Sequence, residues 1–585
     1  MNGICAGRVP TFQLELEIYD VPMLIDAKGL ATGAFVEAMV CIVGSGPAGL
    51  TLARELAGAN SKVVILESGD FRNRRKLKKL NEGDTFGDDY HNPRWGRVRR
   101  VGGSANRWLV EIGNGQRGAR FVPLDPIDFE KREWMPNSGW PLGRADLDPF
   151  YERAQEHCGV GPYHYDLASW SEPGMEAIET PGIETSHFQF GAQDRWTRGH
   201  DELFRETSNI DALLGATAVE IETDATGERV TGVKVVDEAQ RPITVRAPHV
   251  ILAVGCLETS RLLLNSHAVH DNGIGNAHDV VGRYFMDHPQ SYLNVFTPAD
   301  RHVFDTFGIY DLRTKGNMAV MAKLALKDAA LRREHLPNSC HLLFPRRDHF
   351  LSPAFQSFFS LMLDIKYASI PRHALDRAKT MLMGLGDLAP IALWALQGTA
   401  HYPYLAKGGW ANLADKSKLF STFELWTMIE QLPDPANRIR LSARRDYNGT
   451  PLIEVHWRFS EADRDGVRRV RAFIARELEE SGLGKMEWSP DLYTSPGSVH
   501  PIGGARMGDD PRTSVVDRDL QVHGVRNLYV ASSAVFPTSG YANPTLTVVA
   551  LSCRIADQVK RSLAGSIAAE TASHDQIELG LRGAA

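Results

Sequence analysis

The chain has 585 residues, of which 43% are apolar and 23% are charged, and its formal net charge is −7. A single hydrophobic core rarely organises so long a chain, so we expect at least two domains. The composition is typical of a folded, soluble enzyme and argues against a disordered or membrane-spanning protein, while the negative charge disfavours a nucleic-acid partner.

Residues 1–37 show no clear periodicity and are interpreted as an N-terminal extension. Residues 15–20 are acidic where a secretory signal would need a basic start and an apolar run. The six cysteines are scattered without a CxxC pair, which fits a reducing, cytoplasmic setting. The apolar stretch 381–396 contains Asp387 and Pro390 and is too short to span a bilayer, so we expect a buried or interface helix there.

A dinucleotide-binding unit is predicted near the start of the chain. An apolar strand at 39–43 leads into the glycine turn GSGPAG at 44–49, a helix, and a second strand at 62–66 that ends at Glu67. Gly44 permits the tight turn, Gly46 lets backbone amides approach a pyrophosphate, and Gly49 allows close packing of helix on strand. Glu67 is placed to accept hydrogen bonds from an adenosine ribose and would repel the 2′-phosphate of NADP.

A second α/β region follows, and then the pattern changes. Strands are predicted at 230–236, 243–245 and 250–254, followed by a helix at 258–264. Between 290 and 490 the alternation of strand and helix is lost, with a strand at 451–457 and an amphipathic helix that begins at a capping box, Ser460 with Asp463. This stretch is interpreted as a substrate-binding domain.

The C-terminal part carries the most informative runs, HPIGGARMG at 500–508 and GYANPT at 540–545. Supporting runs are VGGSAN at 101–106, SGWP at 138–141, GCLET at 255–259 and GRYFMDHP at 282–289. Together with the N-terminal unit, these runs resemble the glucose-methanol-choline oxidoreductases over nearly the whole chain. The GYANPT run is similar to the corresponding run of one branch of that family, which contains pyranose oxidases, fructose dehydrogenases and gluconate dehydrogenase large subunits.

The resemblance implies an α/β fold, with a Rossmann-like FAD-binding domain and an α+β substrate-binding domain built on an antiparallel sheet. The FAD-binding domain is expected in three parts, at 38–160, 211–289 and 491–565. A segment at 161–210 and the stretch 290–490 are assigned to the substrate domain, and 566–585 to a flexible tail.

The same resemblance assigns the catalytic pair to His500 and Asn543. An alcohol releases its carbon-bound hydrogen as hydride only when its hydroxyl proton leaves, so a base such as histidine is needed beside that oxygen. Asn543 can donate a hydrogen bond to the developing alkoxide. Asn543 could instead only cap a helix, because Pro544 suits the first helical position and an apolar helix follows at 546–555.

The implied cofactor is FAD, bound noncovalently, because Arg107 stands where relatives of this branch often carry histidine. Arg107 and Trp108 are candidate substrate contacts, though a structural role for each is an open alternative. No metal motif is found, and His288 and His341 lack ligand spacing. The residues expected to hold the cofactor are Gly44, Gly46, Gly49, Glu67, Gly102, Gly103, Ser104, Asn106, Ala253, Gly255, Ala531, Ser532, Asn543, Pro544 and Thr545.

The predicted activity is therefore oxidation of the CH–OH group of a sugar, glycoside or related small alcohol. Oxygen, a quinone or an external electron-transfer protein could serve as electron acceptor, since the sequence carries no haem or iron-sulfur ligands. A non-redox lyase that keeps FAD, or the catalytic subunit of a membrane-linked dehydrogenase, remains an alternative. The sequence leaves the exact substrate and the oligomeric state open.

Overall fold

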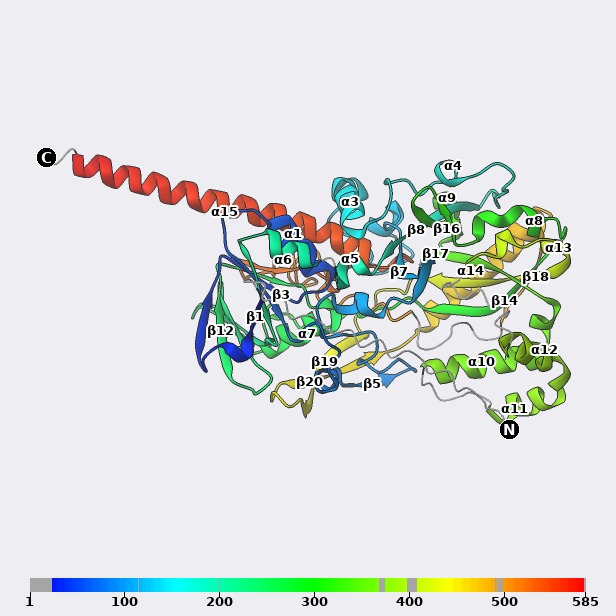
Figure 1. The fold of residues 1–585 in the computed structure, drawn as a ribbon, viewed down its shortest axis with the longest axis horizontal. Coiled ribbons are helices and arrows are strands. Elements are labelled where there is room, and N and C mark those ends of the chain that lie inside the picture. Colours follow the sequence, from blue (N-terminus) through cyan, green and yellow to red (C-terminus); the bar gives the residue numbers. More distant parts are fainter. Residues whose placement is uncertain are drawn as a thin grey trace, which may run out of the picture.

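The computed structural model describes residues 24–113, 115–198, 200–367, 374–396, 408–489, 492 and 498–582. These residues form four sheets, with helices packed around them. Figure 1 shows two lobes side by side: one contains β1, β3 and β12, and the other contains β14, β17 and β18. The first lobe contains the predicted strand–glycine turn–helix unit, and the second contains most of the strands between residues 290 and 490.

The first lobe is built on a six-stranded parallel sheet. Its strand order is β1-β9-β4-β3-β13-β22, and all five adjacent pairs are parallel. β3, β4 and β13 are buried throughout, as expected of a parallel sheet covered on both faces. The bounds are β1 Leu24–Asp26, β9 Ile210–Leu214, β4 Val63–Glu67, β3 Val40–Val43, β13 His249–Leu252 and β22 Leu528–Val530.

Two smaller sheets accompany this lobe. One has the order β10-β11-β12-β2 and the other the order β19-β20-β5. Their strands are β10 Thr217–Thr223, β11 Val230–Val236, β12 Pro242–Arg246, β2 Ala34–Glu37, β19 Arg438–Arg445, β20 Pro451–Trp457 and β5 Gly83–Gly87.

The second lobe contains a sheet with eight strands in the order β21-β14-β18-β17-β16-β8-β7-β6, and β15 pairs with β16 as the ninth. Every pairing in this sheet is antiparallel, as predicted for the substrate domain. The bounds are β21 Gly484–Glu487, β14 Gln290–Pro298, β18 Thr422–Ile429, β17 Ser339–Arg346, β16 Met318–Leu326, β8 Ile183–Ala192, β7 Gln116–Phe121, β6 Val110–Gly113 and β15 Arg313–Lys315.

The helices cover these sheets. α1 follows the glycine turn, α7 follows β13, and α14 begins with the predicted capping box, in which Ser460 and Asp463 bond reciprocally. The α-helices are α1 Pro47–Leu56, α2 Arg75–Lys78, α3 Arg144–Cys158, α4 Leu167–Trp170, α5 Asp194–Thr197, α6 His200–Glu206, α7 Gly255–Asn265, α8 Val303–Thr306, α9 Asp328–Glu334, α10 Pro353–Tyr367, α11 Ala374–Met383, α12 Leu385–Leu396, α13 Lys416–Leu419, α14 Glu461–Glu480 and α15 Thr545–Arg582.

Helix α15 is much longer than the sequence pattern indicated. It packs near α1 and α3 and then extends beyond the rest of the molecule, as Figure 1 shows. The segment 566–585, predicted to be a flexible tail, lies within this helix as far as Arg582. The helix begins at Thr545, one residue later than the start predicted at Pro544.

The chain crosses between the lobes more often than the predicted domain boundaries allow. β6 and β7 come from the first predicted FAD-binding segment but join the antiparallel sheet with β8. The described end of the predicted N-terminal extension is integrated as well, because β1 pairs with β9 and β2 pairs with β12. Such pairings join residues far apart in sequence, so local patterns do not reveal them.

The apolar stretch 381–396 is divided between two helices, α11 and α12, which are separated at Gly384. Leu382, Met383 and Leu385 are exposed around this break. Among the helices described, none combines the length and the apolar character that crossing a bilayer requires.

Candidate active site

Four of the residues predicted to hold the cofactor lie at the carboxyl ends of the parallel strands. Gly44 follows β3, Glu67 ends β4, Ala253 follows β13 and Ala531 follows β22. β3 lies between β4 and β13, at the point where the sheet order reverses direction along the chain, which is where open α/β sheets bind their ligands. The four predicted positions therefore meet at one edge of the sheet.

The glycine turn has the close backbone contacts that a dinucleotide site requires. A Cβ on Gly49 would stand 1.9 Å from the carbonyl oxygen of Gly44, and a Cβ on Gly103 would stand 2.9 Å from Cα of Gly46. The loop 101–106 is thus packed directly on the turn, and the amide of Gly102 donates to the carbonyl of Ser45 at 2.9 Å. Only glycines allow this approach.

Two features of these residues fit the binding of FAD. The N-cap residue of α1 is Gly46, which has no side chain to bond the first amides of the helix. These amides are therefore available to a pyrophosphate. Glu67 is buried and accepts from the Ser45 hydroxyl at 2.6 Å and the Gly69 amide at 2.9 Å. Each carboxylate oxygen can accept two hydrogen bonds, so Oε1 of Glu67 retains capacity for a ribose hydroxyl.

The remaining predicted cofactor residues lie around the same edge. Asn106 donates from Nδ2 to the carbonyls of Val101 and Gly103, both at 2.9 Å, and so closes the loop. Gly255 is the first residue of α7, and the Ser532 hydroxyl accepts from the amide of Ala534. Ser104 is exposed, and Thr545 is the first residue of α15.

His500 is paired with a second histidine. Its Nδ1 lies 3.1 Å from Nδ1 of His288, and Nε2 of His288 lies 3.3 Å from the carbonyl oxygen of Ser539. His288 is fully buried, whereas His500 is partly buried. The two imidazoles are nearly perpendicular, with an angle of 82° between their planes.

This arrangement determines which nitrogen of His500 can act as a base. A carbonyl oxygen only accepts, so Nε2 of His288 carries its proton and Nδ1 of the same ring is an acceptor. Nδ1 of His500 then donates to it, which leaves the lone pair of His500 on Nε2. The chain Ser539–His288–His500 therefore presents Nε2 of His500 as the free basic nitrogen.

Both histidines are kept neutral by their surroundings. Burial lowers the pKa of His288 to about 4. Burial also lowers the pKa of His500 well below its ordinary value, and the neighbouring His288 and Arg120 lower it further. A neutral imidazole is the form that can accept a proton from an alcohol.

Asp287 holds the two histidine segments together. Its Oδ1 accepts from the amides of His288 at 2.7 Å and His500 at 3.0 Å, and its Oδ2 accepts from the Tyr90 hydroxyl at 2.7 Å. The Ser498 hydroxyl also donates to Oδ1, at 3.1 Å. Residues more than 200 positions apart are fixed in this way by one buried carboxylate.

Asn543 is oriented by a buried arginine. Nε of Arg120 donates to Oδ1 of Asn543 at 2.9 Å. Because Oδ1 faces the guanidinium, the NH₂ group of Asn543 is the part available to donate to a ligand. Among the described residues, no hydrogen bond from Asn543 caps α15, which favours the ligand-facing role over the cap-only alternative.

The two candidate substrate residues occupy different surroundings. Arg107 is exposed, and no contact places it beside His500 or Asn543 within the described chain. Trp108 is partly buried and packs edge-on against Phe121, with ring centroids 5.8 Å apart. Their substrate role remains a prediction.

Three site residues were missed from sequence: His288, Asp287 and Arg120. His288 and Asp287 lie in the GRYFMDHP run, which indicates the family but assigns no role to either residue, and His288 has no metal-ligand spacing that would single it out. Arg120 has no motif around it. Its strand pairs with β8 in the antiparallel sheet, a long-range arrangement that periodicity cannot show.

The buried histidines predict acid sensitivity. Burial lowers the pKa of His187 and of His341 to about 3, so these rings, like His288, are neutral when folded and take up protons on unfolding. The free energy of unfolding should be greatest above pH 6.5 and fall as the pH drops towards 4, by about 1.4 kcal/mol per pH unit for each histidine. Urea unfolding at fixed FAD between pH 7.5 and 5 measures this slope.

The matched variants for that experiment are His341→Gln and His267→Gln. His341 is buried, whereas His267 is exposed. The slope should decrease only in His341→Gln, and an unchanged slope in that variant would contradict the assignment.

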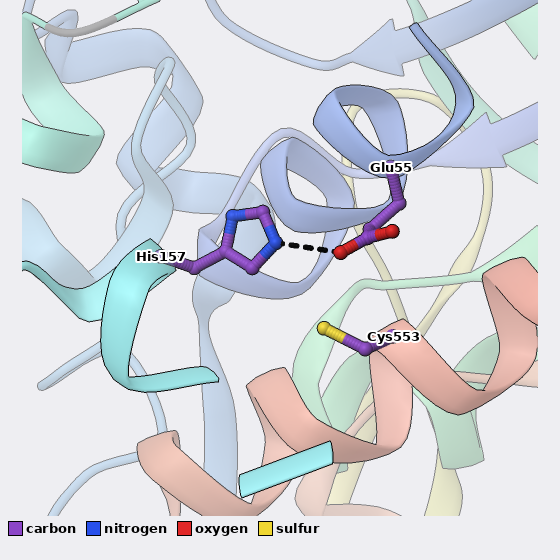
Figure 2. A group of neighbouring side chains, drawn as sticks. All are labelled: Glu55, His157 and Cys553. Atoms are coloured by element: carbon purple, nitrogen blue, oxygen red, sulfur yellow. Dashed lines mark hydrogen bonds and ion pairs between the residues drawn. The ribbon is translucent and has the colours of Figure 1, made fainter. Parts of the chain in front are cut away.

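One further cluster contains side chains of the kinds that bind metal ions. Figure 2 shows Glu55 of α1, His157 of α3 and Cys553 of α15 converging, with ligand atoms within 4.8 Å of one another. Nε2 of His157 lies 2.8 Å from Oε1 of Glu55, while Arg153 and Lys560 approach Oε2 at 2.5 and 3.3 Å. Two cations already neutralise this carboxylate, so the cluster is an ion-pair network that fastens α15 to α1 and α3.

The charge states agree with that assignment. Burial alone would raise the pKa of Glu55, but hydrogen bonds from His157 and Arg153 hold it well below its ordinary value. Burial raises the pKa of the Cys553 thiol, so the thiolate form that binds metals is disfavoured.

Comparisons with known proteins show which family the chain resembles. Two family models described as GMC oxidoreductase match residues 187–290 and 433–552. The chain is 27% identical to the fructose dehydrogenase large subunit of Gluconobacter japonicus, over 90% of this chain and 98% of that protein. It is 24% identical to 6'''-hydroxyparomomycin C oxidase of Streptomyces lividus and 23% identical to paromamine 6'-oxidase of Streptomyces fradiae, each over 92% of this chain and 93% of the relative.

The two matched regions lie in different parts of the molecule. The first includes β8 to β13 and α7, and the second includes β19, β20, β22, His500 and Asn543. The matches thus include β13 and β22 of the parallel sheet and the histidine–asparagine pair, whereas the glycine turn at 44–49 and Glu67 lie outside both. With both GMC oxidoreductase models matched and relatives aligned over most of its length, the chain is an FAD-dependent oxidoreductase of the GMC type that acts on CH–OH groups.

Proposed function

We propose that the protein oxidises the alcohol group of a sugar, glycoside or related small molecule, with His500 as the base and Asn543 as the hydrogen-bond donor. The observation that carries this proposal is the pairing of His500 with His288, which leaves Nε2 of His500 free to accept a proton. The amide of Asn543 is oriented by Arg120, whose charge also acts on His500, which supports a shared site.

In this proposal each residue has a defined task. Nε2 of His500 accepts the hydroxyl proton, and Nδ1 of His500 stays bonded to His288, so the ring does not turn when it becomes charged. The NH₂ group of Asn543 donates to the substrate oxygen as negative charge develops on it. FAD, when bound, supplies the acceptor for the hydride that leaves the substrate carbon.

The mode of FAD attachment and the substrate class are part of the proposal. Attachment is noncovalent, because Arg107 stands where relatives of this branch often carry histidine, close to the position at which pyranose oxidases bond a histidine to the flavin. The relatives named as fructose dehydrogenase and paromamine 6'-oxidase support a hydroxyl-bearing carbohydrate as substrate. Oxygen, a quinone or an external electron-transfer protein is the final electron acceptor. The five described cysteines are free and buried, which supports a reducing, cytoplasmic location.

Anaerobic mixing of the yellow holoenzyme with a panel of alcohols, sugars and glycosides tests the function. An oxidoreductase loses visible flavin absorbance when a substrate is added and air is excluded. Conversion of a substrate with no change in absorbance would instead support a non-redox lyase. A protein that reduces its flavin but turns over only with an added protein acceptor would support the alternative of a catalytic subunit, which the name of the fructose dehydrogenase relative favours.

The histidine pair gives a separate prediction. His288→Leu removes the acceptor that fixes the proton on Nδ1 of His500, so flavin reduction should slow by about tenfold to hundredfold. His288→Asn places an oxygen near the former Nδ1 and should recover much of the rate, because Oδ1 of asparagine can accept the same hydrogen bond. Stopped-flow absorbance of the two variants, compared at equal flavin content, measures the difference. Equal rates in the two would refute a positioning role for His288.

A further inference from the structure

Arg120 of β7 is a buried cation within the proposed active site. Arg120 is only 7% exposed to solvent. Nε donates to Oδ1 of Asn543 at 2.9 Å, Nη2 lies 3.2 Å from the sulfur of Met428, and the guanidinium carbon lies 5.0 Å from the centre of the Phe188 ring. All three partners are uncharged.

Three other buried arginines of the described chain are matched by carboxylates. Arg132 pairs with Glu430 at 2.5 Å, Arg261 with Asp446 at 2.6 Å, and Arg346 with Glu424 at 2.9 Å. Within the described part of the chain, no aspartate or glutamate pairs with Arg120. Burial of a guanidinium without a counter-ion is strongly unfavourable, and in this respect Arg120 differs from the three paired arginines.

A second buried cation lies against the same ring. Nζ of Lys323 is 5.4 Å from the centre of Phe188 and donates to the hydroxyls of Ser186 and Tyr541, at 2.6 and 2.7 Å. Burial lowers the pKa of Lys323, an effect that the nearby Asp125 and Glu184 oppose, and neither carboxylate forms an ion pair with it in the described structure. Positive charge therefore accumulates around Phe188.

The charge of Arg120 acts on His288 and His500. Arg120 contributes to lowering the pKa of both His288 and His500, after the larger effect of burial. It also contacts Asn543 directly. An anion bound by Arg120 would thus lie beside the residues proposed to act on the substrate hydroxyl.

We propose that Arg120 binds a carboxylate of the substrate, so that the preferred substrates are hydroxy acids, with the oxidised CH–OH close to the carboxylate. The proposal rests on the proposed function and names the substrate class of that site. Nη1 has no partner among the described residues, and with Nη2 it offers the planar fork that matches a carboxylate. The ligand supplies the counter-charge that the protein lacks.

The first test is calorimetric titration of the holoenzyme with propionate and with its neutral counterpart propionamide. Propionate should bind more tightly to the wild type, and Arg120→Gln should weaken it by about tenfold or more while leaving propionamide unchanged. The matched control is Arg117→Gln, because Arg117 is exposed on the same strand. It should behave as the wild type.

The second test compares glycerate with glycerol as electron donors under anaerobic conditions. The wild type should be reduced faster by glycerate, and Arg120→Gln should abolish that preference, whereas Arg120→Lys should keep part of it. If Arg120 only stabilised the alkoxide of any alcohol, the variant would slow both donors equally, which would overturn the proposal.

The tests distinguish failure of the carboxylate site at Arg120 from failure of the proposed function. If neither glycerol, glycerate nor the wider alcohol panel reduces the flavin, the proposed function fails, while the propionate titration still decides the anion site. Should Arg120→Gln not fold, the wild type decides alone: propionate must raise its thermal midpoint and propionamide must not. Equal binding of the two compounds by the wild type overturns the inference.

Discussion

Replacing His500 by alanine should slow anaerobic flavin reduction by about 10²- to 10⁴-fold, the range that a positioned general base contributes. The reason is the free Nε2 that the contact with His288 creates. Because the pKa of His500 is held well below its ordinary value, the wild-type rate should persist below pH 6.5 and fall only at more acidic pH. Stopped-flow absorbance from pH 4.5 to 8 measures both effects.

Two controls make the His500 result specific. His302→Ala removes an exposed histidine and should leave the rate unchanged. Flavin content must be equal in all variants, because the base acts on the substrate rather than on FAD binding. Added imidazole should restore part of the rate of His500→Ala. A variant that reduces its flavin as fast as the wild type would rule out the assigned base.

Replacing Gly49 by alanine should give a protein that does not retain FAD. The new Cβ would stand 1.9 Å from the carbonyl oxygen of Gly44, closer than any real contact, and it would meet rigid backbone. The turn must open or α1 must shift, which displaces the helix end that receives the pyrophosphate. Visible absorbance of the purified protein, with FAD released by denaturation as the measure of content, gives the result.

The matched control for Gly49 is Gly29→Ala, where a Cβ would meet nothing within 4 Å. This variant should be as yellow as the wild type. Circular dichroism separates loss of FAD from loss of fold in Gly49→Ala. Full flavin content in that variant would show that the turn does not hold the cofactor as proposed.

The cofactor half of the site could be predicted because its determinants are local. Strand, glycine turn, helix, strand and Glu67 follow one another within 30 residues, and β3, α1 and β4 lie within a few residues of their predicted bounds. Gly44, with a φ of 103°, and Gly49, where a Cβ would stand 1.9 Å from a backbone oxygen, leave no room for another residue type. The strand at 451–457 and the capping box at Ser460 are local for the same reason.

The catalytic half could be predicted only in part. His500 and Asn543 were identified through family resemblance, but the partners that determine their chemistry come from distant segments. His288 lies 212 positions before His500, and Arg120 lies 423 positions before Asn543. Which tautomer His500 adopts depends on the carbonyl of Ser539, and no sequence pattern encodes a contact between a side chain and a remote backbone atom.

The strand order of the parallel sheet constrains when the protein can become functional during its synthesis. β13 has β3 on one side from early on, but its other neighbour, β22, is formed by residues 528–530. Until the ribosome has made them, a nascent chain carries an unpaired apolar edge, and Asn543 does not yet exist. Incomplete chains should therefore depend on chaperones, and a product cut short before β22 should neither mature nor leave a partly active enzyme behind.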